Sequence, residues 1–199
     1  METVESMISY YQVLKENYES GKPGMKFNKD RAHNSTVQRF MLDISREIKM
    51  FCGQLSVFRN GFYNYISEDS NELSEMLKNE IINSLSSFLI KEDSKLIIIF
   101  ENFKKDYLKD LIVSETFLQG IKDKKILLFK LKDNLKDKKN LNHFSISDKK
   151  IVRVEQDKEQ HNAVCTINYE ESNRVFNIIY DRLLTLAEPI PDNEIDLNQ

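Results

Sequence analysis

The sequence has few of the residues from which common active sites are built. Only five glycines occur in 199 residues, so loops that bring backbone amides close to phosphate are scarce. It contains no GxSxG, HExxH or Gly-rich phosphate-binding motif. These absences leave a serine, cysteine or carboxylate enzyme without support from a recognisable motif.

Cysteine and histidine are also sparse. Cys52 and Cys165 both lie in apolar, strand-like runs, where a buried thiol behaves as a small hydrophobic group. We expect two reduced structural thiols, as in a cytosolic protein. The three histidines lack the spacing of a zinc site. We therefore expect no metal and no cofactor.

Long apolar segments are missing as well. No stretch approaches the roughly 20 apolar residues that a membrane span requires. The N-terminus is acidic and amphipathic, with no positive region before an apolar core, so we expect no secretory signal and a cytoplasmic location. The net charge of −3 gives no bulk attraction to nucleic acid or to anionic membrane.

One segment departs from this acidic balance. Between residues 122 and 158 there are 12 Lys or Arg against 6 Asp or Glu, and a basic band of this kind can contact phosphates. No aromatic residues interleave the lysines for base stacking. We favour a lysine-rich solvated surface and leave a nucleic-acid partner open.

Hydrophobic periodicity predicts an α/β fold. Apolar runs at 48–55, 95–102 and 125–132 are continuous, as expected of strands covered on both faces, and helical patterns separate them. Shorter strands are predicted at 143–147, 150–155 and 163–168, and helices at 2–20, 34–47, 71–91, 105–121 and 170–188. We predict a mixed β-sheet flanked by helices on both faces. The expected units are an N-terminal helix and turn (1–24), the α/β domain (25–188) and an acidic, flexible tail (189–199).

The order of elements and a fragmentary motif resemble one phospholipase D-like repeat. That family carries H-x-K-x-x-x-x-D, followed by G-S-x-N. Here His143 takes the His position, but Ser145 stands in place of Lys and Lys150 in place of Asp. The run CTIN at 165–168 has Cys in place of Gly, while Thr166 and Asn168 keep the hydroxyl and the amide. The likeness spans roughly residues 28 to 187.

The resemblance implies a mechanism whose parts are incomplete in this chain. In the family, His attacks phosphorus while Lys and Asn donate hydrogen bonds to the phosphoryl oxygens. Losing one such donor typically costs about 2.7–4 kcal/mol of barrier lowering. We therefore predict a catalytically inactive, phospholipase D-like binding or assembly subunit, with His143 inherited or structural. By analogy, such modules belong to bacterial multi-protein systems that handle DNA or defend against phage. The alternative is a phosphodiesterase or nuclease whose site is rebuilt around His143, Thr166 and Asn168.

Two further groups of residues are candidates for binding. Arg31 and His33 lie at the start of a predicted helix, where backbone N–H groups favour anions, although helix capping explains the same residues. The other anion or nucleic-acid candidates are Lys149, Lys150 and Arg153. The N-terminal helix has one apolar stripe, formed by Met7, Ile8, Tyr11, Leu14 and Tyr18. Since the family pairs two repeats, we expect a homodimer or another protein partner, with this stripe as one candidate interface and folding back onto the domain as the alternative.

Overall fold

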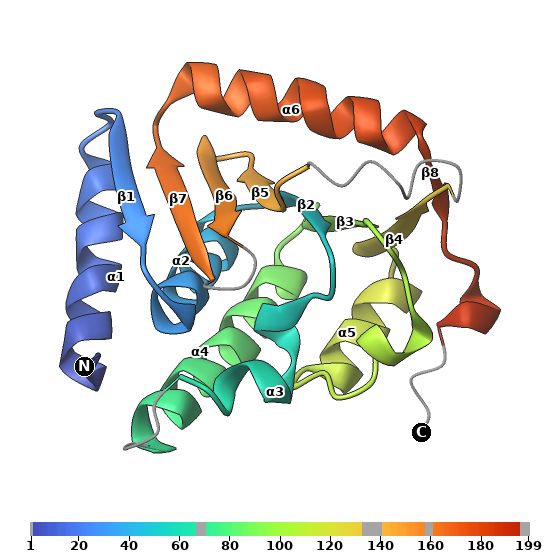
Figure 1. The fold of residues 1–199 in the computed structure, drawn as a ribbon, viewed down its shortest axis with the longest axis horizontal. Helices are drawn as coiled ribbons and strands as arrows, with labels where there is room; N and C mark the ends of the chain where they lie inside the picture. The colour runs from blue at the N-terminus through green and yellow to red at the C-terminus, as the bar shows by residue number, and fades with distance from the viewer. Residues whose placement is uncertain (1, 67–70, 133–140, 158–160, 196–199) are drawn as a thin grey trace.

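An eight-stranded mixed β-sheet organises the computed structural model, which describes residues 2–66, 71–132, 141–157 and 161–195 (Figure 1). The strand order is β1-β7-β6-β5-β2-β3-β4-β8. The strands are β1 (Gly24–Asn28), β2 (Glu47–Cys52), β3 (Lys95–Phe100), β4 (Ile126–Leu131), β5 (Phe144–Ser147), β6 (Ile151–Asp157), β7 (Asn162–Ile167) and β8 (Ala187–Pro189). The helices are α1 (Val4–Glu19), α2 (Arg31–Ile44), α3 (Asn60–Tyr63), α4 (Asn71–Ile90), α5 (Ser114–Lys122) and α6 (Glu170–Thr185), with short 3₁₀ turns η1 (Ser56–Phe58), η2 (Lys105–Tyr107) and η4 (Asp192–Glu194).

The three long apolar runs form the parallel part of the sheet, since β3 pairs in parallel with both β2 and β4. Ile98 contributes to the main core with α2 and α4, whereas the next residue, Ile99, packs in the second core beside Tyr180 of α6. Both faces of β3 are therefore buried, which explains the apolar run from Leu96 to Phe100, whereas Lys49 interrupts β2 and Lys130 interrupts β4. The predicted mixed α/β fold is confirmed.

The helices divide unequally between the two faces. Residues of α1, α2, α4 and α5 share the main core with one face of the sheet. The amphipathic helix α6, orange to red in Figure 1, crosses the other face. Tyr180 of α6 is fully buried there, and its hydroxyl donates to the carbonyl oxygen of Ile97 at 2.8 Å.

Two edge strands lie outside the sequence prediction. Strand β1 pairs antiparallel with β7 at one edge, and β8 pairs antiparallel with β4 at the other. The second pairing changes the expectation of a flexible tail from residue 189. Ile190 is buried, and Glu194 forms an ion pair with Lys130 at 3.1 Å. The tail therefore packs against the domain as far as residue 195, and 196–199 lie outside the described residues, as does the charged loop 133–140.

The N-terminal helix packs onto its own domain. Met7 and Leu14 are buried in the main core. Tyr11 donates a hydrogen bond to Asp43 of α2 at 2.7 Å, and the ring of Tyr18 lies 6.1 Å from that of Phe40. Of the five stripe residues, Ile8 alone is exposed by about half. The stripe therefore packs mainly within the domain, which is the alternative given for it from the sequence, and its use as an interface stays a prediction.

None of the helices in the described part of the chain has both the length and the apolar character that crossing a membrane requires.

Candidate functional site

A cavity of about 400 Å³ opens where the parallel strands β2 and β3 end and β5 begins. Polar side chains from four parts of the chain line it: Asn34, Gln38, Glu101, His143, Arg153 and Glu155. Carboxyl ends of parallel strands are a common place for ligand sites in α/β sheets. The cavity is therefore the candidate binding site.

Strand alternation places the polar groups of the β5–β6 hairpin on the cavity side. Phe144 of β5 packs under α6, so the residues on either side of it, His143 and Ser145, point to the opposite face. Across the hairpin, Arg153 pairs with Ser145, and the backbone amide of Glu155 donates to the carbonyl of His143 at 2.8 Å. The short turn thus places Arg153 beside Ser145 and Glu155 beside His143, the residues at the Lys and His positions of the family motif.

His143 lies between two carboxylates. Its Nδ1 is 2.9 Å from Glu155 Oε2, and its Nε2 is 3.0 Å from Glu101 Oε2. All three side chains are less than a quarter exposed. A neutral imidazole carries one N–H, whereas the imidazolium carries two and can donate to both carboxylates at once. Each ring nitrogen thus faces a carboxylate, and neither is open to the phosphorus atom of a substrate.

Arg153 supplies a guanidinium to the cavity wall. Its Nε donates to Asn34 Oδ1 at 2.9 Å, and its Nη2 lies 3.8 Å from Glu155 Oε1. Burial lowers the pKa of Arg153, and the charge of Glu155 opposes that shift. Burial by itself would raise the pKa of Glu155, but the hydrogen bond from His143 and the charge of Arg153 outweigh it and lower the pKa. The carboxylate is therefore held in its ionised form.

A glycine permits the close approach of the histidine ring. A Cβ atom at Gly53, directly after β2, would lie 2.9 Å from Cε1 of His143. Since that separation is shorter than real Cβ contacts, any larger residue would push the ring from its place between the carboxylates.

Gln38 brings an unused hydrogen-bond donor to the same cavity. Asn34 and Gln38 stand four residues apart on α2 and so lie on one face of the helix. Asn34 Oδ1 accepts from Asn28 and Arg153, and its amide donates to the carbonyl of His161. Gln38 is 2% exposed, and its Nε2 has no partner in the described part of the chain. A buried donor of this kind costs about 1–3 kcal/mol.

The other two residues of the phospholipase D-like motif lie elsewhere. Thr166 faces α6, where its hydroxyl donates to Ser172 at 3.0 Å. Asn168 follows the far end of β7, and its amide donates to the carbonyls of Asn17 and Tyr18 at the C-terminus of α1. Neither residue lines the cavity that contains His143. The structure therefore does not gather the three residues on which a rebuilt catalytic site was predicted.

The basic candidates are dispersed rather than collected into one surface. Lys149 and Lys150 lie in the β5–β6 turn and pair with Asp148 and Glu170 respectively. Arg31 begins α2, where its Nη1 donates to the carbonyl of Phe62 and its guanidinium lies 5.4 Å from the ring centre of Phe62 and 5.0 Å from that of Tyr65. Arg153 alone of these residues lines the cavity.

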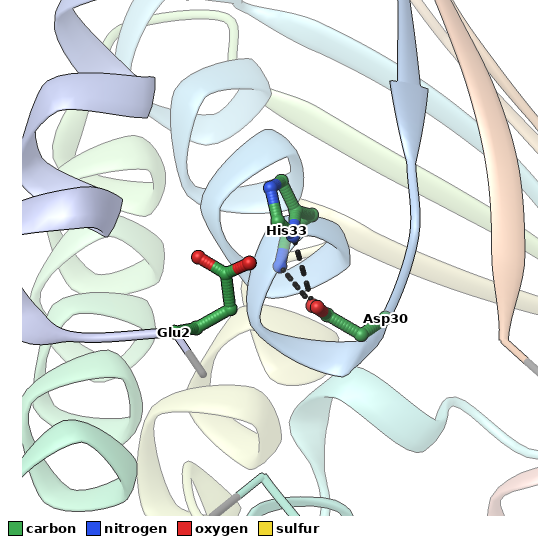
Figure 2. A group of neighbouring side chains, drawn as sticks. All are labelled: Glu2, Asp30 and His33. Carbon is green, nitrogen blue, oxygen red and sulfur yellow. Dashed lines mark hydrogen bonds and ion pairs between the residues drawn. The ribbon is translucent and has the colours of Figure 1, made fainter.

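Helix capping accounts for His33 and its neighbours. Asp30 is the N-cap of α2, and its Oδ1 accepts from the backbone amide of His33 and lies 3.0 Å from His33 Nδ1. Glu2 approaches the same pair from the start of α1, where its carboxylate also accepts from Ser6. Figure 2 shows these three side chains together. Because each carboxylate already serves a helix N-terminus, we assign the group a capping role.

Comparison with solved structures identifies the fold class. No protein-family model matches the sequence, and no curated protein matches it. The chain is similar in structure to TrmBL2, an archaeal chromatin protein that binds DNA, with a TM-score of 0.53 and 14% identity over 92% of this chain and 62% of that one. It is also similar to Nuc, a phospholipase D family member from Salmonella typhimurium, with a TM-score of 0.51 and 9% identity over 85% of this chain and 99% of that one. The chain thus has a phospholipase D-like fold.

The sequence analysis did not identify Gly53, Glu101 or the side-chain amides of Asn34 and Gln38 as residues of this site. The signal for the first two is their position, since each directly follows a buried parallel strand. The spacing of Asn34 and Gln38 gives them one helix face, but a solvated face would have the same spacing. Their convergence depends on tertiary packing.

Proposed function

We propose that this chain is a non-catalytic binding module with a phospholipase D-like fold, working as a subunit of a larger assembly. The observation that supports it most strongly is the engagement of both His143 nitrogens by Glu101 and Glu155. A histidine nucleophile needs one nitrogen lone pair aimed at phosphorus. Here the approach to either nitrogen is lined by a carboxylate.

Electrostatics supports the same proposal. A phosphodiester entering the cavity would meet two carboxylates, and two like charges 4 Å apart repel by about 4 kcal/mol at an effective dielectric of about 20. The Lys of the family motif is replaced by Ser145, a buried neutral hydroxyl. Arg153 lies opposite Ser145 in the β5–β6 pairing, and it is already paired with Glu155.

The test is an activity assay on purified protein. We expect no hydrolysis of bis-p-nitrophenyl phosphate, plasmid DNA or phosphatidylcholine above a buffer blank. The control is the His143→Ala variant, which should give the same background. Turnover that disappears in this variant would replace the proposal with the alternative, an active phosphodiesterase or nuclease.

The proposal extends to partners. A protein partner or a second copy of the chain is expected, in a bacterial system that handles DNA or defends against phage. TrmBL2, the archaeal chromatin protein that binds DNA, has a similar fold, and this likeness in fold supports nucleic acid as a partner. Light scattering should give a mass above 23.5 kDa, alone or with co-expressed neighbouring genes. DNA retardation that weakens steeply with salt would identify phosphate contacts, and a strictly monomeric protein without a recoverable partner would contradict the assembly role.

A further inference from the structure

The cavity beside His143 is lined by more hydrogen-bonding groups than the chain itself uses. Gln38 Nε2 is buried, lines the cavity and has no partner among the described residues. Buried polar groups in folded proteins are nearly always paired with protein, water or ligand. An unpaired amide donor at a cavity wall is therefore evidence for an acceptor atom that enters from outside.

The charges on the cavity wall disfavour an anionic occupant. The wall carries the carboxylates of Glu101 and Glu155 beside the guanidinium of Arg153, and the ring of His143 lies between the two carboxylates. Burial, together with the charge of Arg31, lowers the pKa of His161, so that side chain adds no further positive charge near neutral pH. Two carboxylates therefore face one guanidinium on this wall, and the complement is a molecule without negative charge that donates hydrogen bonds.

The wall also has flat apolar surfaces. The rings of Phe62 and Tyr107 line the cavity, and aromatic rings stack on planar heterocycles. A volume of about 400 Å³ lies within the range of pockets that hold small organic ligands. The occupant should thus be without negative charge, planar in part, and able both to donate and to accept hydrogen bonds.

We propose that this cavity binds a free nucleoside, with guanosine as the best match. Guanine presents two adjacent N–H donors and a carbonyl acceptor along one edge. Carboxylates of the type at Glu101 and Glu155 accept from such donors, and the Gln38 amide donates to such a carbonyl. Adenine offers one amino donor on the corresponding edge and fits less well. The inference rests on the proposed function, because it requires the cavity to bind rather than to hydrolyse.

The test is calorimetric titration of the purified chain with guanosine, adenosine, cytidine, uridine, ribose and inorganic phosphate. We expect guanosine to bind most tightly and to raise the melting temperature. Gln38→Leu should weaken guanosine binding at least tenfold while the melting temperature of the free protein stays the same or rises, since an unpaired donor has been removed. The matched control is Ser94→Ala, because Ser94 Oγ is also buried and without a partner in the described segments but does not line the cavity.

Several outcomes would overturn the inference. They are no binding of any nucleoside, equal affinity in Gln38→Leu and wild type, or binding of ribose or phosphate in preference to guanosine. If Gln38→Leu fails to fold, Tyr107→Ala gives a second reading, with weaker nucleoside binding expected from the lost ring face. If the protein neither binds a nucleoside nor hydrolyses phosphodiesters, this inference is wrong and the proposed function still stands. If it hydrolyses phosphodiesters, the proposed function is wrong.

Discussion

The two ends of the β5–β6 hairpin use polar residues in opposite ways. At the turn end, Asp148 Oδ1 accepts from the backbone amide of Arg46 at 3.1 Å, and Lys150 forms an ion pair with Glu170 on α6. Nearby, Asn168 holds the C-terminus of α1. Each of these polar groups performs a local structural task that explains its presence.

At the open end, the polar groups surround a void instead. His143, Arg153 and Glu155 form a network with Glu101, and Gln38 adds a donor that has no partner among the residues that the structure describes. Buried networks of this kind are costly when they are only partly satisfied. The difference between the ends suggests that the turn end serves the fold and the open end serves a ligand. Substitutions matched between the two ends can break or sharpen that comparison.

The largest effect is expected from Glu155→Ala at the open end. This change removes the carboxylate beside Arg153, whose side chain is 15% exposed, and takes one partner from His143. Removing one member of a buried pair typically costs about 3–5 kcal/mol, because the other charge stays buried. We expect a loss of about 3 kcal/mol in the free energy of unfolding, measured by chemical denaturation.

The matched control is Glu170→Ala at the turn end. The Lys150–Glu170 pair is more than half exposed on both sides, and exposed pairs contribute about 0–1 kcal/mol. Comparable losses for the two variants would mean that the open end is not a coupled buried network.

A smaller loss of stability is expected from Gly53→Ala. The new Cβ would lie 2.9 Å from the His143 ring, and overpacking of this kind typically costs about 1–3 kcal/mol. The control is Gly61→Ala, where the nearest atom is Asp110 Oδ2 at 3.8 Å. In a His143→Ala background the cost of Gly53→Ala should shrink, as a double-mutant cycle would measure. An unchanged cost in that background would show that the ring is not what Gly53 accommodates.

The fold could be predicted further than the site, for a physical reason. Strand β3 is buried on both faces, so residues 96–100 are continuously apolar, and in β4 only Lys130 interrupts the apolar run, which makes both strands easy to recognise. The edge strands β1 and β8 are five and three residues long, and β8 ends in a proline, so their local signal is weak. Their pairing is decided by what lies beside them in the folded chain.

The site depends on register, which the sequence pattern leaves open. Alternation shows that His143 and Ser145 share a face, and that Arg153 and Glu155 share one. Whether these faces coincide, and whether Thr166 joins them, is set by the turn and by the pairing of β6 with β7. A shift of one residue would have brought Thr166 to the cavity side. The register thus decides whether Thr166 shares the cavity with His143, but it cannot restore the Lys and Asp of the family motif, which Ser145 and Lys150 replace.

The smallest expected effect is a dependence of stability on pH that belongs to the open end. Burial alone would raise the pKa of Glu155, but the hydrogen bond from His143 and the charge of Arg153 lower it below the ordinary value of a glutamate in the unfolded chain. A depressed carboxyl pKa stabilises the folded state above the unfolded pKa, and this contribution is lost as pH falls through the folded pKa. The groups that face Glu155 are Arg153, His143 and His161. We therefore expect the difference in melting temperature between wild type and Glu155→Gln to be widest above pH 5 and to close towards pH 3.

The comparison for that experiment is Asp106→Asn. Hydrogen bonding to Lys109 lowers the pKa of Asp106, but this pair lies on the surface, where water and salt screen it. Its melting temperature should track that of wild type at every pH. Since both variants replace a carboxylate by an amide, general acid destabilisation cancels between each variant and wild type. A gap for Glu155→Gln that stays constant from pH 7 to pH 3 would mean that the carboxylate contributes through its shape and not through its charge.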